Sequence, residues 1–168
     1  MLKVLLFFVI FGVMSVSFVN ARDCNVCDYW IAEVTQKESS SENCKKDPKD
    51  LTDEEILEII ECLLNQKGNK SLHIGVVLRD NVSQTFGSSP VEVVALFYAS
   101  YLFEGNKDFA SAMVLLYDFD DQEPNAPKAV KIAHKSYRKW FEEVKKVGLK
   151  KAREMKLDPL KDTKVSWY

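Results

Sequence analysis

The sequence predicts an all-α protein, a compact bundle of five to six helices with a disulfide-stapled N-terminal helical hairpin and a long basic amphipathic C-terminal helix. Three observations predict this fold. Apolar residues recur at helical spacing along most of the 168 residues. Helix-start signals precede two of these stretches. Four cysteines cluster near the N-terminus, where they can cross-link neighbouring helices.

Residues 1–21 have the pattern of a secretory signal peptide. Lys3 precedes an apolar run over residues 4–14, and the small residues Val19 and Ala21 stand before the expected cleavage site. The apolar run is shorter than the roughly 20 residues that a membrane-spanning helix needs. We therefore expect a secreted protein without a transmembrane segment, whose residues 22–168 form a single α-helical domain.

The four cysteines predict structural disulfides. An even number in a secreted chain indicates two bridges. A bridge within the short Cys-x-x-Cys segment is disfavoured if a helix begins there, so each of its cysteines is expected to pair with one of the later two. Zinc is disfavoured because only one such segment exists and no histidine lies near it, and we expect no metal and no cofactor. The predicted disulfide residues are Cys24, Cys27, Cys44 and Cys62.

Two sequons also fit secretion. Asn69-Lys70-Ser71 and Asn81-Val82-Ser83 match the acceptor pattern for N-linked glycosylation. Their use would place both ends of the intervening segment at the surface.

The first two predicted helices form the stapled hairpin. One begins near Cys27 and is followed by a polar loop over residues 36–50. The next begins at a capping box, in which the Thr52 hydroxyl and the Glu55 carboxylate satisfy free backbone N–H groups, and it ends at Gly68. An antiparallel arrangement would bring Cys62 near the first cysteines. The apolar stripes are Cys27, Trp30, Ile31 and Val34, then Ile56, Ile59, Ile60 and Leu63.

The middle of the chain is less regular. Residues 71–86 alternate as a strand would but also fit a helix, and helix is favoured because the sequence offers no convincing partner strand. Ser89, Pro90 and Glu92 predict a helix start with Ser89 as the N-cap. Residues 91–103 are apolar on every side, which predicts a buried central helix. A further helix is expected over residues 107–117.

The last predicted helix covers residues 128–155, and the tail beyond Pro159 is expected to be irregular. Its apolar positions follow the 3,4,3,4,3 spacing of a helix that packs along a partner. These positions are Val130, Ala133, Tyr137, Trp140, Val144 and Val147. The other faces carry a predicted basic partner-binding surface made of Lys131, Lys135, Lys139, Lys145, Lys146, Lys150 and Arg153.

The formal net charge of −2 conceals a division of charge along the chain. Residues 22–125 form an acidic body with 9 Lys and Arg against 20 Asp and Glu, a net charge of −11. Residues 126–168, the basic C-terminal helix and tail, hold 13 Lys and Arg against 5 Asp and Glu, a net charge of +8. The near-neutral sum argues against a nucleic-acid binder, whereas the basic segment predicts an anionic partner.

Catalytic signatures are absent from the sequence. No nucleophile elbow, zinc-protease motif, phosphate-binding loop or dinucleotide fingerprint occurs. His73 is expected to be structural or exposed, and His134 to lie on the surface. The sequence is therefore interpreted as a non-enzymatic binding protein, an extracellular effector or modulator of the saliva, venom or body-fluid type that acts on a protein partner.

Two alternative functions remain open. Trp30, Phe97 and Tyr101 could enclose a small apolar ligand in a carrier or scavenger, although such aromatics also suit a filled core. The basic helix could instead lie on an anionic membrane with Trp140 and Phe141 inserted into lipid.

Overall fold

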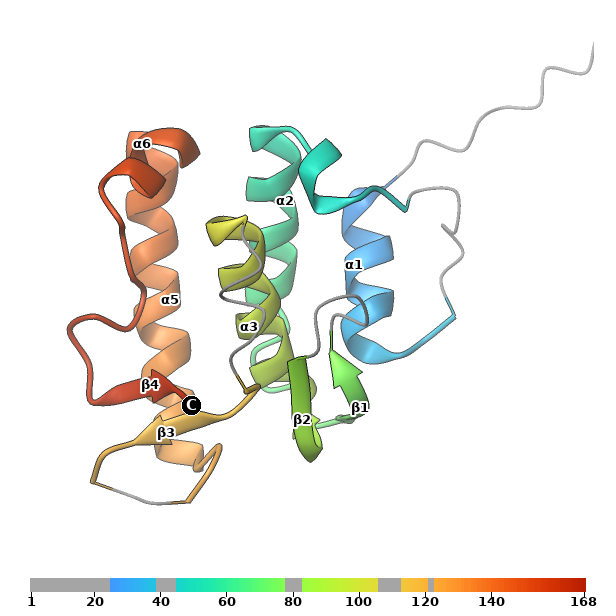
Figure 1. Cartoon of the computed structure of the whole chain (residues 1–168), viewed down its shortest axis with the longest axis vertical. Coiled ribbons are helices and arrows are strands. Elements are labelled where there is room, and N and C mark those ends of the chain that lie inside the picture. The colour runs from blue at the N-terminus through green and yellow to red at the C-terminus, as the bar shows by residue number, and fades with distance from the viewer. Residues whose placement is uncertain (1–24, 39–44, 78–82, 106–112, 121–122) are drawn as a thin grey trace, which may run out of the picture.

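The computed structural model describes residues 25–38, 45–77, 83–105, 113–120 and 123–168 (Figure 1). In these ranges the chain forms five α-helices and two small antiparallel sheets of two strands each, so the fold is mixed α/β and the predicted all-α class is wrong. None of the described helices is long and apolar enough to cross a membrane. The helices are α1 (Val26–Thr35), α2 (Asp53–Leu64), α3 (Val91–Glu104), α5 (Pro127–Val147) and α6 (Leu149–Glu154). The strands are β1 (Leu72–Val77), β2 (Ser83–Pro90), β3 (Leu116–Asp118) and β4 (Val165–Trp167), and a 3-10 turn, η2, covers Pro48–Asp50.

The predicted disulfide staple between the first two helices is confirmed, but the antiparallel hairpin is wrong, because α1 and α2 run in the same direction (Figure 1). The Asn25 side chain caps α1 by accepting from the backbone N–H groups of the second and third residues that follow it. The predicted capping box is present at the start of α2, where Thr52 and Glu55 bond reciprocally. A disulfide joins Cys27 to Cys62 with 6.0 Å between their Cα atoms. The bridge therefore holds α1 against α2.

The segment favoured as a helix is a β-hairpin instead. β1 pairs with β2 from Leu72 opposite Pro90 to Val77 opposite Ser83, and a bulge lies at Gly75, whose φ is +96°. The alternation of β1 was visible in the sequence. β2 reads Ser-Gln-Thr-Phe-Gly-Ser-Ser-Pro and has a single large apolar residue, so no two-residue hydrophobic period marks it as the partner.

The central helix is confirmed, although its start differs by one residue. Every residue from Val91 to Ser100 is buried, and α3 contacts each of the other four described helices. Pro90, rather than Ser89, is the N-cap residue, and no side chain caps the helix. The Ser89 hydroxyl donates to the Val114 carbonyl oxygen at 2.9 Å, which ties the end of β2 to the segment before β3.

The predicted C-terminal helix divides into α5 and α6. Gly148 separates them with φ +87° and ψ +149°, a conformation that interrupts the helix. Beyond α6 the chain returns along α5, and β4 pairs antiparallel with β3 (Figure 1). The expected helix end at residue 117 and the irregular tail are therefore wrong, because three-residue strands pair through long-range contacts that leave no periodicity in the sequence. Residues 106–112 lie outside the described ranges.

Candidate functional site

Helix α5 has one apolar face and one basic face. The predicted apolar seam is confirmed, since five of its six residues are buried and Val147 is half-buried. An α-helix advances 100° per residue, so positions four apart lie near one line along its surface. Side chains at 131, 135, 139 and 146 therefore project from the face opposite the seam. All four are exposed, and we call this set the lysine row: Lys131, Lys135, Lys139 and Lys146.

The lysine row carries four positive charges on one helix face, with the exposed Glu142 between Lys139 and Lys146 on the same face. The backbone positions of its first three lysines are spaced about 6 Å apart along the helix axis. At 1.5 Å per residue, the whole row covers about 22 Å. No member forms an ion pair with a described residue. The ion pairs of α5 use two other lysines: Lys128 with Asp118 at 3.7 Å, and Lys145 with Glu142 at 2.8 Å and with Glu61 at 4.0 Å. These two lysines flank the row and are partly neutralised.

The remaining predicted basic residues, Lys145, Lys150 and Arg153, are not members of the row. The pKa of Lys145 is raised, first by its hydrogen bond to Glu142 and further by attraction to that carboxylate and to Glu61. Lys150 is exposed on α6, beyond the break at Gly148. Arg153 is half-buried, and its guanidinium donates to the carbonyl oxygens of Leu102 and Phe103.

Arg153 therefore supplies hydrogen bonds to carbonyl groups at the C-terminal end of α3. The last carbonyls of a helix lack intrahelical partners and carry partial negative charge, so a guanidinium there is stabilising. Its charge serves the fold instead of extending the basic surface.

The structure describes only part of the predicted modification sites. Cys24, Cys44 and Asn81 lie outside the described residues. Asn69 is half-buried, and its side-chain amide donates to the Gln66 side-chain oxygen at 3.0 Å. The Asn69 side-chain oxygen accepts from the backbone N–H of Ser71 at 3.2 Å.

Two histidines are buried, which is a correction for His134. This residue was expected on the surface, but its ring is 1% exposed and faces α3. Burial lowers the pKa of His134 to about 4, although the nearby Glu92 carboxylate opposes the shift. His73 is also buried, and its Nδ1 lies 3.1 Å from the Val34 carbonyl oxygen. The sequence signal for this contact was Glu92, an acidic residue at the otherwise apolar start of α3, because a buried carboxylate requires a polar partner.

Two of the three aromatic residues proposed to line a ligand carrier pack against other aromatic rings, and the third, Tyr101, is half-buried against the same core. The rings of Trp30 and Tyr98 meet edge to face with centroids 5.7 Å apart. Phe97 meets Trp167 in the same way at 5.4 Å. Trp140 and Phe141, the pair named for lipid insertion, are buried in the same core.

The described residues contain no group of three or more His, Cys, Asp or Glu side chains able to hold a metal ion. No protein-family model, curated protein or solved structure matches this chain. The site is therefore defined by its geometry alone: a linear array of exposed ammonium groups on one rigid helix.

Proposed function

We propose that the chain is a secreted, non-enzymatic binding protein, an extracellular effector or modulator that holds an anionic protein partner on the lysine row. The observation that carries the proposal is the set of four exposed lysines that form no ion pair with the described residues. Complementary charge on a partner would increase the rate of association and fix the orientation of docking.

The rigidity of α5 supports this choice. The buried seam fixes the helix against the core, so the lysines are displayed at constant spacing from an element that does not have to order on binding. The membrane alternative would require Trp140 and Phe141, which are buried, to leave that core. An electrostatic contact uses only side chains that already face solvent.

Secretion and modification belong to the same proposal. A disulfide between Cys27 and Cys62 suits an oxidising compartment, in agreement with the signal sequence over residues 1–21. We propose cleavage after Ala21, a single mature domain over 22–168, and glycosylation at Asn69 and Asn81. The intact mass of secreted protein, before and after enzymatic deglycosylation, tests each of these assignments.

A charge-reversal experiment tests the function. The mature protein is immobilised, and partners are captured from the extracellular fluid into which it is secreted. The test variant is Lys131→Glu, Lys135→Glu and Lys139→Glu. The matched control is Lys37→Glu, Lys45→Glu and Lys161→Glu, which changes the net charge equally at three exposed lysines that also form no ion pair with described residues.

The proposal predicts an acidic protein that is captured by the wild type and the control variant but not by the row variant. Raising the salt from about 0.15 M to 0.5 M should release it, because the screening length then falls well below 8 Å. Poly-L-glutamate serves as a defined probe and should compete. Equal capture by the row variant and its control would overturn the proposal.

A further inference from the structure

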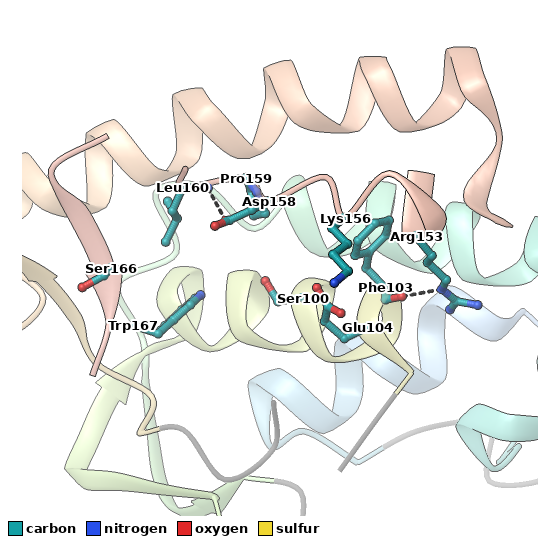
Figure 2. A pocket seen from close by; sticks show the side chains of 10 residues that line it. All are labelled: Ser100, Phe103, Glu104, Arg153, Lys156, Asp158, Pro159, Leu160, Ser166 and Trp167. Atoms are coloured by element: carbon teal, nitrogen blue, oxygen red, sulfur yellow. Dashed lines mark hydrogen bonds between the residues drawn. The ribbon is translucent and has the colours of Figure 1, made fainter. Parts of the chain in front are cut away.

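A cavity of about 650 Å³ lies beside the C-terminal end of α3, where the segment from α6 to β4 crosses it (Figure 2). Its lining includes the apolar residues Phe103, Leu160 and Trp167, of which Phe103 is 1% exposed and packs edge to face on Trp140. Volumes of this size are typical of sites for small organic ligands. The cavity is separate from the lysine row, so the inference drawn from it is independent of the proposed function.

One wall of the cavity is held in place by a buried hydrogen-bond network. The hydroxyl groups of Ser100 and Tyr137 lie 2.5 Å apart, and the Trp167 indole N–H donates to the Tyr137 oxygen at 2.9 Å. Figure 2 shows the nitrogen side of the Trp167 indole directed towards Ser100. The ring of Trp167 is further fixed by its edge-to-face contact with Phe97. The aromatic wall is therefore preorganised.

Two carboxylates line the same cavity. Glu104 is the last residue of α3, and Asp158 lies in the loop after α6. Partial burial raises the pKa of Glu104, and the negative charge of Asp158 adds to this, while Arg153 partly offsets the effect. Asp158 accepts a hydrogen bond from the Leu160 backbone N–H at 2.8 Å. Neither carboxylate forms an ion pair with a described residue, so a bound cation would relieve their mutual repulsion.

Two basic residues, Arg153 and Lys156, also line the cavity, and Arg153 partly offsets the negative charge of Glu104. Arg153 donates to the carbonyl oxygens at the end of α3, as described above, and its charge is directed there. Lys156 is exposed and forms no ion pair with Glu104 or Asp158, although Figure 2 shows its ammonium on the same side of the cavity as Glu104. Its flexible stem lets the ammonium move into solvent when another cation enters.

We propose that this cavity binds a small organic cation of the arylalkylamine class, with its ring against Trp167 and its ammonium between Glu104 and Asp158. Burial of the ring supplies the apolar part of the affinity, and the two carboxylates select for positive charge. An indole ring in the same wall adds attraction for a cation that approaches its face. A neutral or anionic molecule of the same shape gains only the contribution from burial of its ring.

Titration calorimetry with four probes of similar shape tests the selection for charge. The probes are phenethylamine, 2-phenylethanol, 3-phenylpropionate and phenylalanine, each added to the folded mature protein. The proposal predicts that phenethylamine binds at least about tenfold more tightly than the alcohol, a ratio that corresponds to 1.4 kcal/mol. Equal affinity for the amine and the alcohol, tighter binding of the propionate or of phenylalanine, or no heat with the amine at millimolar concentration would overturn it.

Variants of the two carboxylates localise the site. Glu104→Gln and Asp158→Asn should each weaken phenethylamine binding about tenfold and leave the affinity for 2-phenylethanol unchanged. Asparagine retains an oxygen that can accept from the Leu160 N–H, so the loop is preserved. The control is Glu154→Gln, an exposed carboxylate of α6 that does not line the cavity and should have no effect. Unchanged amine affinity in both carboxylate variants, with unfolding midpoints matching the wild type, would refute the assignment.

Discussion

Glu92 and His134 form a buried pair between α3 and α5, with 3.7 Å between a Glu92 carboxylate oxygen and Nε2 of the His134 ring. The carboxylate also accepts from the backbone N–H of Gly68 at 2.7 Å and is bonded to the Lys70 ammonium. The histidine has no such compensation: neither ring nitrogen has a hydrogen-bond partner among the described residues. A neutral ring is therefore preferred in the folded state.

This pair predicts loss of stability in mild acid. The folded pKa of His134 is about 4 and the ordinary value is 6.5, so the unfolded chain binds the proton first as the pH falls. The stability contributed by the neutral ring is complete above pH 6.5 and is lost as the pH falls towards 4. At about 1.4 kcal/mol per pKa unit, the loss is on the order of 3 kcal/mol.

Urea unfolding of the wild type and His134→Leu at pH 7 and pH 4.5 measures this effect. The variant cannot take up the proton, so its free energy of unfolding should fall less between the two pH values. Carboxylates that do not contact His134 contribute equally in both proteins and cancel in the comparison. An identical fall in wild type and variant would show that His134 does not contribute. Lys67 and Arg138 also lower the pKa of the His134 ring, so both residues stay unchanged in the two proteins compared.

Loss of the Cys27–Cys62 bridge should destabilise the protein without abolishing α2. The two cysteines are 35 residues apart, and removing the cross-link increases the entropy of the unfolded chain, which lowers the free energy of unfolding by about 3 to 4 kcal/mol. Chemical denaturation of Cys27→Ser, Cys62→Ser measures the change. A free energy of unfolding within error of the wild type would contradict it.

The pairing of the other two cysteines follows from the first bridge. With Cys27 joined to Cys62, a second disulfide among the four cysteines has to join Cys24 to Cys44. Peptide mapping of unreduced, secreted protein should recover this pair. Recovery of free thiols at both positions would mean that the protein has a single bridge.

Replacement of Gly148 by alanine should destabilise the junction of α5 and α6. Its φ of +87° and ψ of +149° are almost restricted to glycine, and such strain costs of order 1–3 kcal/mol. A Cβ at this position would meet no atom within 4 Å, so steric contact adds nothing. Thermal unfolding should show a lower midpoint for Gly148→Ala. A midpoint equal to or above that of the wild type would mean that alanine is accommodated at this junction without backbone strain.

Gln36 should protect the edge of β1 from exchange with solvent. Its side-chain oxygen accepts from the Ile74 backbone N–H at 2.9 Å, and its amide donates to the Ile74 carbonyl oxygen at 2.8 Å. In Gln36→Ala the Ile74 amide proton should exchange with solvent faster than in the wild type. Hydrogen–deuterium exchange followed by NMR measures this rate. Gln36→Glu keeps the acceptor and is the control, with protection retained. Equal exchange in all three proteins would contradict this role.

The elements that the sequence predicts correctly are those with a signal inside a single helix or cap. The Thr52–Glu55 capping box and the seam of α5 are local patterns, and both are present in the structure. The β-hairpin was missed because β2 lacks an apolar period, and β3 and β4 are too short to show one. Pairing of these strands depends on contacts between distant parts of the chain, which local periodicity does not encode.

Of the candidate sites, those built on one helix can be predicted from the sequence, and those that join separate elements cannot. The lysine row follows from helical spacing, so it could be read from the sequence before the structure. Arg153 was assigned to the same surface because the break at Gly148 was read as continuous helix. The meeting of Glu92 with His134, and of Glu104 with Asp158, joins residues from separate elements that only the tertiary fold brings together.

The division of charge along the chain is also a separation in space. α5 and α6 lie together on one side of the molecule, while α1 lies on the other side of α2 and α3 (Figure 1). The centres of positive and negative charge therefore do not coincide, and the molecule has a permanent electric dipole despite a formal net charge of −2. Two copies can align head to tail, a heterologous arrangement that need not close into a ring. Light scattering should report attraction between copies at low ionic strength that added salt abolishes, the opposite of what a uniformly charged protein shows.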